Sequence, residues 1–243
     1  MRRLTGDSST IGTVPALFLL RVAAVFAVLA VAACTSSNSG KAPGPETTGG
    51  IVDTSVFRGV DYEFVMFETP EDMAKAKGVT TVMSALVGGF AQGRVLAGPG
   101  IEDRHVVMWA TIRETLEGPT SEDGSAYVEI LQPLCAGNVP CATVEDFAAA
   151  IPAGTKVLVL GDTAAEVAPP DLRYADNDAG RPPGARLVRP NPGGLLFESA
   201  TTAGRTVVGA YAKIEDMPEA WHPDPAAGID GLTARLKAAG VTA

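Results

Sequence analysis

The sequence is short of basic residues, histidine, cysteine and aromatic side chains. Its 243 residues hold 19 Lys and Arg against 28 Asp and Glu, which gives a formal net charge of −9. That balance repels a phosphate backbone and excludes a general nucleic-acid binder. Collagen, coiled-coil and multi-span membrane architectures fail on composition. What is present is a 46% share of hydrophobic residues, enough for a packed core, with 27 Gly and 18 Pro to interrupt it.

Motifs of the common enzyme classes are also missing. The chain contains no G-x-S-x-G, no H-E-x-x-H, no P-loop and no S-x-x-K, so we expect neither catalytic residues nor a cofactor of those classes. A pair of carboxylates that meet only in the folded chain would leave no such signature. Two interpretations stay open: a non-catalytic module that binds a protein, glycan or small ligand, and a hydrolase of envelope polymers that works through carboxylates.

The N-terminus has the layout of an export signal. Arg2 and Arg3 open the chain, Arg21 follows a moderately apolar stretch, and residues 22–33 have no polar side chain. These 12 residues would span roughly 18 Å as a helix, less than the roughly 20 residues that cross a bilayer. Basic residues, a short apolar run and small residues in this order are typical of a secretory signal.

The apolar run ends in Val-Ala-Ala-Cys, with Cys34 as the first of three cysteines. This ending resembles the lipobox of bacterial prolipoproteins. The resemblance implies cleavage after residue 33, a diacylglycerol on the Cys34 thiol and a place on the outer face of the cell membrane. Two or more acyl chains suffice for stable anchoring. An uncleaved anchor over residues 11–33, with Arg21 inside it, and ordinary secretion are the alternatives, and the export route stays open.

Residues 35–50 contain no large apolar side chain, so they cannot bury enough surface to offset the entropy of ordering. We therefore expect a signal peptide at 1–33, the lipidated Cys34 with a flexible tether at 34–55, and one extracytoplasmic domain at 56–243. The tether would hold the domain away from the membrane.

Strands dominate the predicted domain. Residues 106–116 alternate with Met108, Ala110 and Ile112 on one face, which indicates a half-buried strand. Residues 157–160 are apolar on both faces and predict a central strand. Further strands are expected at 79–87, 127–131, 195–197 and 206–211. Gly88 and Gly89 should close the first of these through a hairpin connection with Gly at positive φ.

Helices are few and short. Thr69 and Thr143 each precede an acidic residue and an apolar run, as helix N-caps do, and Asp230 should cap a C-terminal helix that buries Ile229, Leu232 and Leu236. The fold class is mainly β (α+β), an antiparallel β-barrel or sandwich with peripheral helices. The order of elements over residues 69–212 resembles uncharacterised envelope lipoproteins of high-GC Gram-positive bacteria, which implies a barrel similar to the OB-fold.

Cys135 and Cys141 flank a Gly/Asn/Pro turn. An exported protein meets an oxidising compartment, which favours a disulfide between them. A redox pair is the alternative, because residue 143 starts a helix close by, although such pairs favour a two-residue spacing.

No metal site is expected. His105 and His222 are the only histidines, and their spacing from the cysteines matches no usual zinc pattern. Residues 176–180 resemble the start of a calcium loop, but the distal bidentate Glu is missing. A solvated turn is the favoured interpretation of that segment.

Overall fold

The computed structural model describes residues 50–59, 64, 66–119, 123–135, 139–202, 204–212 and 216–241. All of these belong to one compact unit, Pro45–Ala243. Val52, close to the start of the described residues, already packs against this unit. Its side chain is 9% exposed, and its backbone N–H donates to the Ser199 hydroxyl.

Strands make up most of the unit, and the mainly β class is confirmed. The strands are β1 (Thr81–Gly98), β2 (Ile101–Glu117), β3 (Ser125–Leu131), β4 (Lys156–Thr163), β5 (Arg173–Ala175), β6 (Leu187–Thr201) and β7 (Gly204–Gly209). The helices are α1 (Pro70–Ala74), α2 (Val144–Ala150) and α3 (Gly228–Ala238), with short 3-10 turns η1 (Thr54–Phe57) and η4 (Glu219–Trp221).

Five of the strands pair in a ring. The order β2-β3-β6-β4-β1 is closed by the pairing of β1 with β2, while β5 adds to the edge of β1 and β7 to β6. Every ring pairing is antiparallel except β3–β6. That parallel contact is brief, with only Tyr127 opposite Leu187 and Val128 opposite Val188. The ring is therefore held least firmly where β3 meets β6.

Side-chain alternation divides the apolar residues among three clusters. The ring interior holds alternate residues of all five strands, among them Met108, Val128 and Val159, and α2 covers it with Phe147. A second cluster lies between the outer face of β4 and β6 and the helices α1 and α3, around the fully buried Trp221. A third, smaller one contains Val107, Ala164 and Leu187, with Tyr127 packed against it.

The alternating pattern of β2 and the fully apolar pattern of β4 predicted correctly which faces of these strands are buried. Met108 and Ala110 are 0% and 1% exposed in the ring interior, and Ile112 packs against it while half-buried. In β4, Val157 and Val159 face the ring interior, while Leu158 and Leu160 face the helices. A strand apolar on both faces is central because both of its faces are covered, as predicted.

The predicted hairpin at Gly88 and Gly89 is wrong. β1 runs through both glycines to Gly98, and neither has a positive φ. The register shifts between Val87 and Gly89, which marks a bulge. The indole of Trp109 on β2 packs over the gap, and a Cβ at Gly88 would lie 1.9 Å from its ring. The glycines therefore make room for Trp109 rather than a turn.

Helix capping is confirmed at two of three places. The hydroxyls of Thr69 and Thr143 accept hydrogen bonds from the backbone N–H groups three residues on. The Asp230 cap is wrong, because α3 begins at Gly228 without a side-chain cap. Asp230 lies in the first turn, where its carboxylate pairs with Lys156. The predicted burial of Ile229, Leu232 and Leu236 is confirmed.

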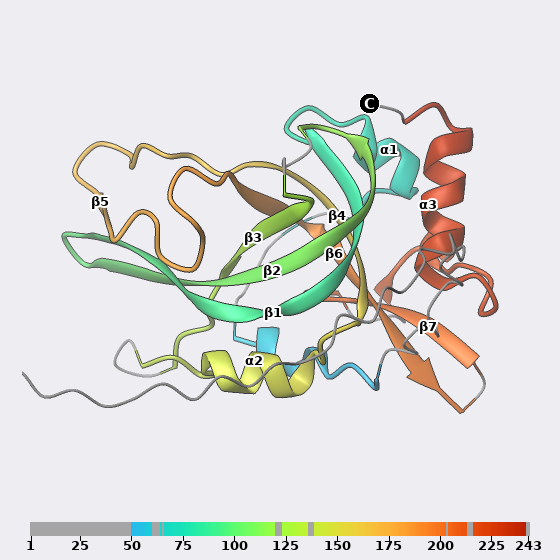
Figure 1. Ribbon diagram of the computed structural model, residues 1–243, viewed down its shortest axis with the longest axis horizontal. Helices are drawn as coiled ribbons and strands as arrows, with labels where there is room; N and C mark the ends of the chain where they lie inside the picture. The colour runs from blue at the N-terminus through green and yellow to red at the C-terminus, as the bar shows by residue number, and fades with distance from the viewer. Residues whose placement is uncertain are drawn as a thin grey trace, which may run out of the picture. The chain divides into compact units, whose positions relative to one another are not determined.

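A long connection between β4 and β6 carries β5, which the sequence did not indicate. Figure 1 shows this connection beside the far end of the β1–β2 hairpin, where Val95, Leu96 and Ala97 pair with β5. The connection thus covers part of the outer face of the ring.

The contact of Gly88 with Trp109 predicts a coupled pair of substitutions. Gly88→Ala should lower the free energy of unfolding by about 1–3 kcal/mol, because the added methyl overlaps the indole and forces a shift. In a Trp109→Ala background the same change should cost distinctly less. Urea unfolding of the four proteins measures the coupling, and equal costs in both backgrounds would contradict the packing described.

Candidate functional site

A cavity of about 400 Å³ opens at one end of the strand ring. The beginnings of β1, β3 and β6 and the ends of β2 and β4 meet there, beside the last residues of the β4–β6 connection. We call it the mouth pocket. Barrel mouths are frequent binding sites, and ligand pockets usually fall between 300 and 1,000 Å³. Its floor is apolar and includes the core residues Met83 and Ala126, with Ile112 and Val188 beside them.

Polar groups line the rest of the mouth pocket. The described lining also includes the hydroxyl-bearing residues Thr81, Ser125, Tyr127 and Thr163 and the basic residue Arg186. Asp and Glu are absent from the described residues that line it. Arg186 is exposed, which places the one cationic group of this lining near solvent. The described lining therefore combines an apolar floor, hydroxyl-bearing residues and one basic residue.

Two threonine hydroxyls at this end of the ring are buried without a partner. The Oγ1 atoms of Thr81 and Thr115 have no hydrogen bond among the described residues. Thr81 is 3% exposed. Thr115 lies opposite Met83 across the β1–β2 ladder, so its side chain shares the inner face with a residue of the pocket floor. An unpaired buried polar group costs about 1–3 kcal/mol, so these hydroxyls require an explanation.

A buried ion pair lies on the outer face of the same sheet. Arg94 of β1 is 0% exposed and Glu129 of β3 is 2% exposed. Arg94 donates from Nε to Glu129 Oε1 at 2.5 Å and from Nη2 to Oε2 at 3.1 Å. Arg189 donates to the same Oε2 at 3.1 Å. The pair is bidentate, the geometry in which Arg and carboxylate interact most strongly.

The β4–β6 connection contacts the Arg94–Glu129 ion pair directly. Arg94 Nη1 donates to Asn177 Oδ1 at 2.8 Å, and the Arg94 guanidinium lies 3.7 Å from the centroid of the Tyr174 ring. Arg181 then holds the end of the connection, donating to the backbone oxygens of Asn177 and Ala185. Because Ala185 lines the mouth pocket, the buried pair is linked to one wall of the pocket.

Protonation in this cluster follows from burial and charge. Burial raises the pKa of Glu129, but the hydrogen bond from Arg94 and the neighbouring positive charges outweigh it and leave the pKa below its usual value. Burial also lowers the pKa of His105, more than the Glu129 charge raises it. His105 Nδ1 lies 3.1 Å from the Arg94 carbonyl oxygen. At neutral pH the cluster holds an ionised Glu129 and an uncharged His105.

An exposed aromatic side chain lies next to the pocket. Trp109 is 43% exposed and lies opposite Tyr127, a pocket residue, in the β2–β3 ladder. Directly opposite residues share a face of the sheet. The outer face beside the mouth pocket therefore presents an indole and a phenol ring.

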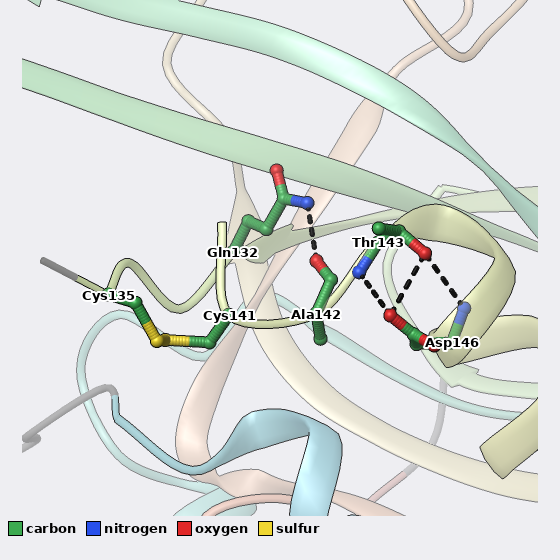
Figure 2. Close-up of a disulfide and its surroundings, with 6 residues drawn as sticks. All are labelled: Gln132, Cys135, Cys141, Ala142, Thr143 and Asp146. Carbon is green, nitrogen blue, oxygen red and sulfur yellow. Dashed lines mark hydrogen bonds between the residues drawn. A yellow bond between two sulfur atoms is a disulfide. The ribbon is translucent and has the colours of Figure 1, made fainter. Parts of the chain in front are cut away.

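The disulfide is confirmed. Figure 2 shows the bond between Cys135 and Cys141, whose Cα atoms are 5.1 Å apart. Gln132 donates to the Ala142 carbonyl oxygen next to it, and the capping box of Thr143 and Asp146 starts α2. The disulfide thus closes the turn that leads from β3 into α2, away from the mouth pocket. Cys34 lies outside the described residues.

The other polar residues singled out in the sequence lie apart from the pocket. His105 belongs to the buried cluster, and His222 follows η4. In the calcium-like segment, Asn177 accepts from Arg94, and Asp178 pairs with Arg181 at 3.7 Å. Among the described residues no group of His, Cys, Asp and Glu is arranged to hold a metal ion.

Sequence reasoning missed both the ion pair and the mouth pocket. Arg94 and Glu129 are 35 residues apart, and each is a single charged residue in an otherwise alternating strand, which is typical of a solvated face. Thr81 looked like an ordinary strand residue. The only available signal was the charged residue between two buried apolar ones at Glu129.

The geometry of the ion pair predicts that replacing Glu129 lowers the free energy of unfolding more than replacing Arg189 does. Glu129→Gln should lower the free energy of unfolding by about 3–5 kcal/mol, because it leaves Arg94 charged and buried. Arg189→Gln removes a guanidinium whose side chain is 50% exposed and should cost less than about 1 kcal/mol. Chemical denaturation measures both. Similar losses of unfolding free energy in the two variants would contradict the claim that Glu129 compensates the buried charge of Arg94.

Comparison with known proteins found no match for the chain. No family model, no curated protein and no solved structure matches it. The geometry of its own residues therefore carries the functional argument.

Proposed function

We propose that the protein is a lipid-anchored module of the bacterial envelope that binds a small ligand in the mouth pocket and does not catalyse a reaction. One observation carries the binding part: the described lining of the pocket has an apolar floor, hydroxyl-bearing residues and an arginine, and it has no carboxylate. A few polar groups around an apolar cavity is the usual make-up of a ligand site.

The alternative hydrolase needs two carboxylates that face each other across a cleft, roughly 5–9.5 Å apart. Among the described residues, the two most buried carboxylates are engaged elsewhere. Glu129 is held by Arg94 and Arg189. Glu198 accepts the backbone N–H of Ile229 at the start of α3 and pairs with Arg205. Neither lines the mouth pocket, which favours binding over hydrolysis.

The strand ring supports an OB-like interpretation of the domain. Its five strands form a closed circuit with α2 between the third and fourth strands, in keeping with the small Greek-key barrels that bind ligands at their loops and on one sheet face. The long β4–β6 connection covers part of that face here. The surface left open for ligand binding is therefore the ring mouth and the area around the exposed Trp109.

The location at the membrane rests on the lipobox-like residues around Cys34. The disulfide supports export, because such bonds persist in oxidising compartments. Within the described part of the chain, none of the helices has the length and apolar character to cross a bilayer. A diacylglycerol on Cys34 would supply the attachment, and the segment before Val52 would separate the domain from the lipid surface.

Mass spectrometry of the protein released from membranes tests both parts together. We expect a peptide that begins at Cys34 and carries a diacylglycerol, a mass that persists when the protein is denatured. We also expect a second, non-covalent mass, one per chain, that is present under native conditions and lost on denaturation.

Cys34→Ser is the matched control, and it should lose the lipid but keep the non-covalent mass. An unmodified Cys34 in the native protein would contradict the anchor. Absence of the bound mass, together with cleavage of envelope polymer that stops when a carboxylate is replaced, would instead support the hydrolase.

A further inference from the structure

The β4–β6 connection, residues 164–186, buries little apolar surface. Ala164 is the only buried residue in this segment, all of which is described. Besides the short ladder between β5 and β1, Arg94 holds the segment by donating to Asn177 and by lying against the Tyr174 ring. A segment with so few buried apolar contacts is among the first to open in a folded protein. Its attachment therefore depends on the charged cluster beneath it.

His105 of β2 lies between two places where the connection contacts the sheet. β1 has one extra residue at this point, so Gly93 and Arg94 both lie opposite His105. A bulge of this kind redirects a side chain. On the other side, Gly180 of the connection packs so closely on Val107, the next β2 residue on this face, that a Cβ at Gly180 would lie 2.8 Å from the Val107 Cβ. His105 itself is 6% exposed.

The uncharged imidazole of His105 carries its proton on Nδ1. This atom lies 3.1 Å from the carbonyl oxygen of Arg94, and a carbonyl oxygen can only accept a hydrogen bond. Nδ1 therefore donates. A further proton, gained from solvent, would go to Nε2 and give the buried ring a positive charge.

The charged groups around His105 leave no carboxylate oxygen available for that charge. Arg94 of β1 and Arg189 of β6 are cations, and Glu129 of β3 is the carboxylate that interacts with the imidazole. Both Glu129 oxygens already accept hydrogen bonds from these two guanidinium groups. A protonated His105 would be a third cation beside one carboxylate.

The other charges nearby are paired with one another. On β2, Arg104 pairs with Glu102 at 2.6 Å. Within the connection, Arg181 pairs with Glu166 at 2.9 Å and with Asp178 at 3.7 Å. These carboxylates are engaged with their own partners, so they do not offset a charge on the imidazole.

We propose that this cluster is an acid-sensitive lock on the β4–β6 connection. While His105 is uncharged, Arg94 holds Asn177 and Tyr174, and the connection stays on the sheet. A proton on Nε2 makes the cluster too positive to remain buried, so the connection detaches and water reaches the charges. Detachment also loosens the wall of the mouth pocket at Ala185, although the lock itself does not depend on whether the pocket holds a ligand.

The pH window follows from the two states of the connection. Burial, more than the neighbouring guanidinium groups, lowers the pKa of His105 from its ordinary 6.5 while the connection is attached. In the detached, hydrated state the pKa returns toward 6.5. The detached state therefore binds more protons below that pH, and acid favours it. The pKa of Glu129 is lowered from 4.5, so its protonation contributes only below that pH.

Hydrogen exchange of the full-length protein at pH 7.5 and 5.0, without added ligand, measures the lock. Labelling times are scaled for the intrinsic effect of pH on exchange. Amides of β5 and of its partners at 95–97 should lose protection several-fold at pH 5.0. The upper limit is about thirtyfold, which one group of ordinary pKa 6.5 can contribute at that pH. Amides of the central strand β4 should keep their protection.

Three substitutions identify the sensor. His105→Gln does not titrate in this range and should remove the acid response. His222→Gln replaces the only other histidine, which is exposed, and should respond like the wild type. Arg189→Gln removes a half-exposed guanidinium that helps to lower the pKa of His105, so it should reduce the response without abolishing it.

Equal protection of β5 at the two pH values in the wild-type protein would overturn the proposal. A response of full size in His105→Gln, or one that extends to β4 and so reports general unfolding in acid, would do the same. If His105→Gln does not fold, Arg189→Gln decides: a reduced response supports the lock, and an undiminished one rejects it.

Discussion

The bidentate contact between Arg94 and Glu129 is the interaction on which the functional end of the molecule depends. Both residues are buried, and neither could stay charged there alone. The pair joins β1 to β3, and Arg94 extends the contact to Asn177 and the Tyr174 ring of the β4–β6 connection. A buried ion pair adds little net stability, but it fixes one arrangement, because every displaced partner leaves an unpaired charge.

The mouth pocket follows from that arrangement. β3 and β6 pair at this end of the ring through Tyr127 with Leu187 and Val128 with Val188, and both Tyr127 and Val188 line the pocket. The connection, held by Arg94 and then by Arg181, ends at this opening and brings Ala185 and Arg186 to its wall. The buried charges of Arg94 and Glu129 thus lie outside the ring and position a wall, while the described lining of the pocket has one exposed basic residue, Arg186, and no carboxylate. This division suits a binding site better than a catalytic one.

The sequence predicted the parts of the fold that depend on local pattern. The faces of β2 and β4, the caps at Thr69 and Thr143, and the disulfide follow from alternation, capping chemistry and a turn between two cysteines. Each of these signals lies within a few neighbouring residues, so no tertiary context is needed to recognise it.

The features that sequence reasoning missed depend on distant contacts. The glycines at 88 and 89 have the composition of a turn, and only Trp109 on the next strand explains why β1 continues through them. The Asp230 carboxylate pairs with Lys156 instead of capping α3. The charge at Glu129 is buried because a remote connection covers it. The lipid anchor at Cys34 and the relationship to OB-like envelope lipoproteins stay predictions, since Cys34 lies outside the described residues and no comparison matches the chain.

The central claim is that the mouth pocket is a ligand site. A crystal structure of the protein as released from its own membrane tests this most directly. The account predicts non-protein density on the apolar floor formed by Met83, Ile112 and Ala126. A mouth that holds only water, or that is filled by protein side chains, would contradict it.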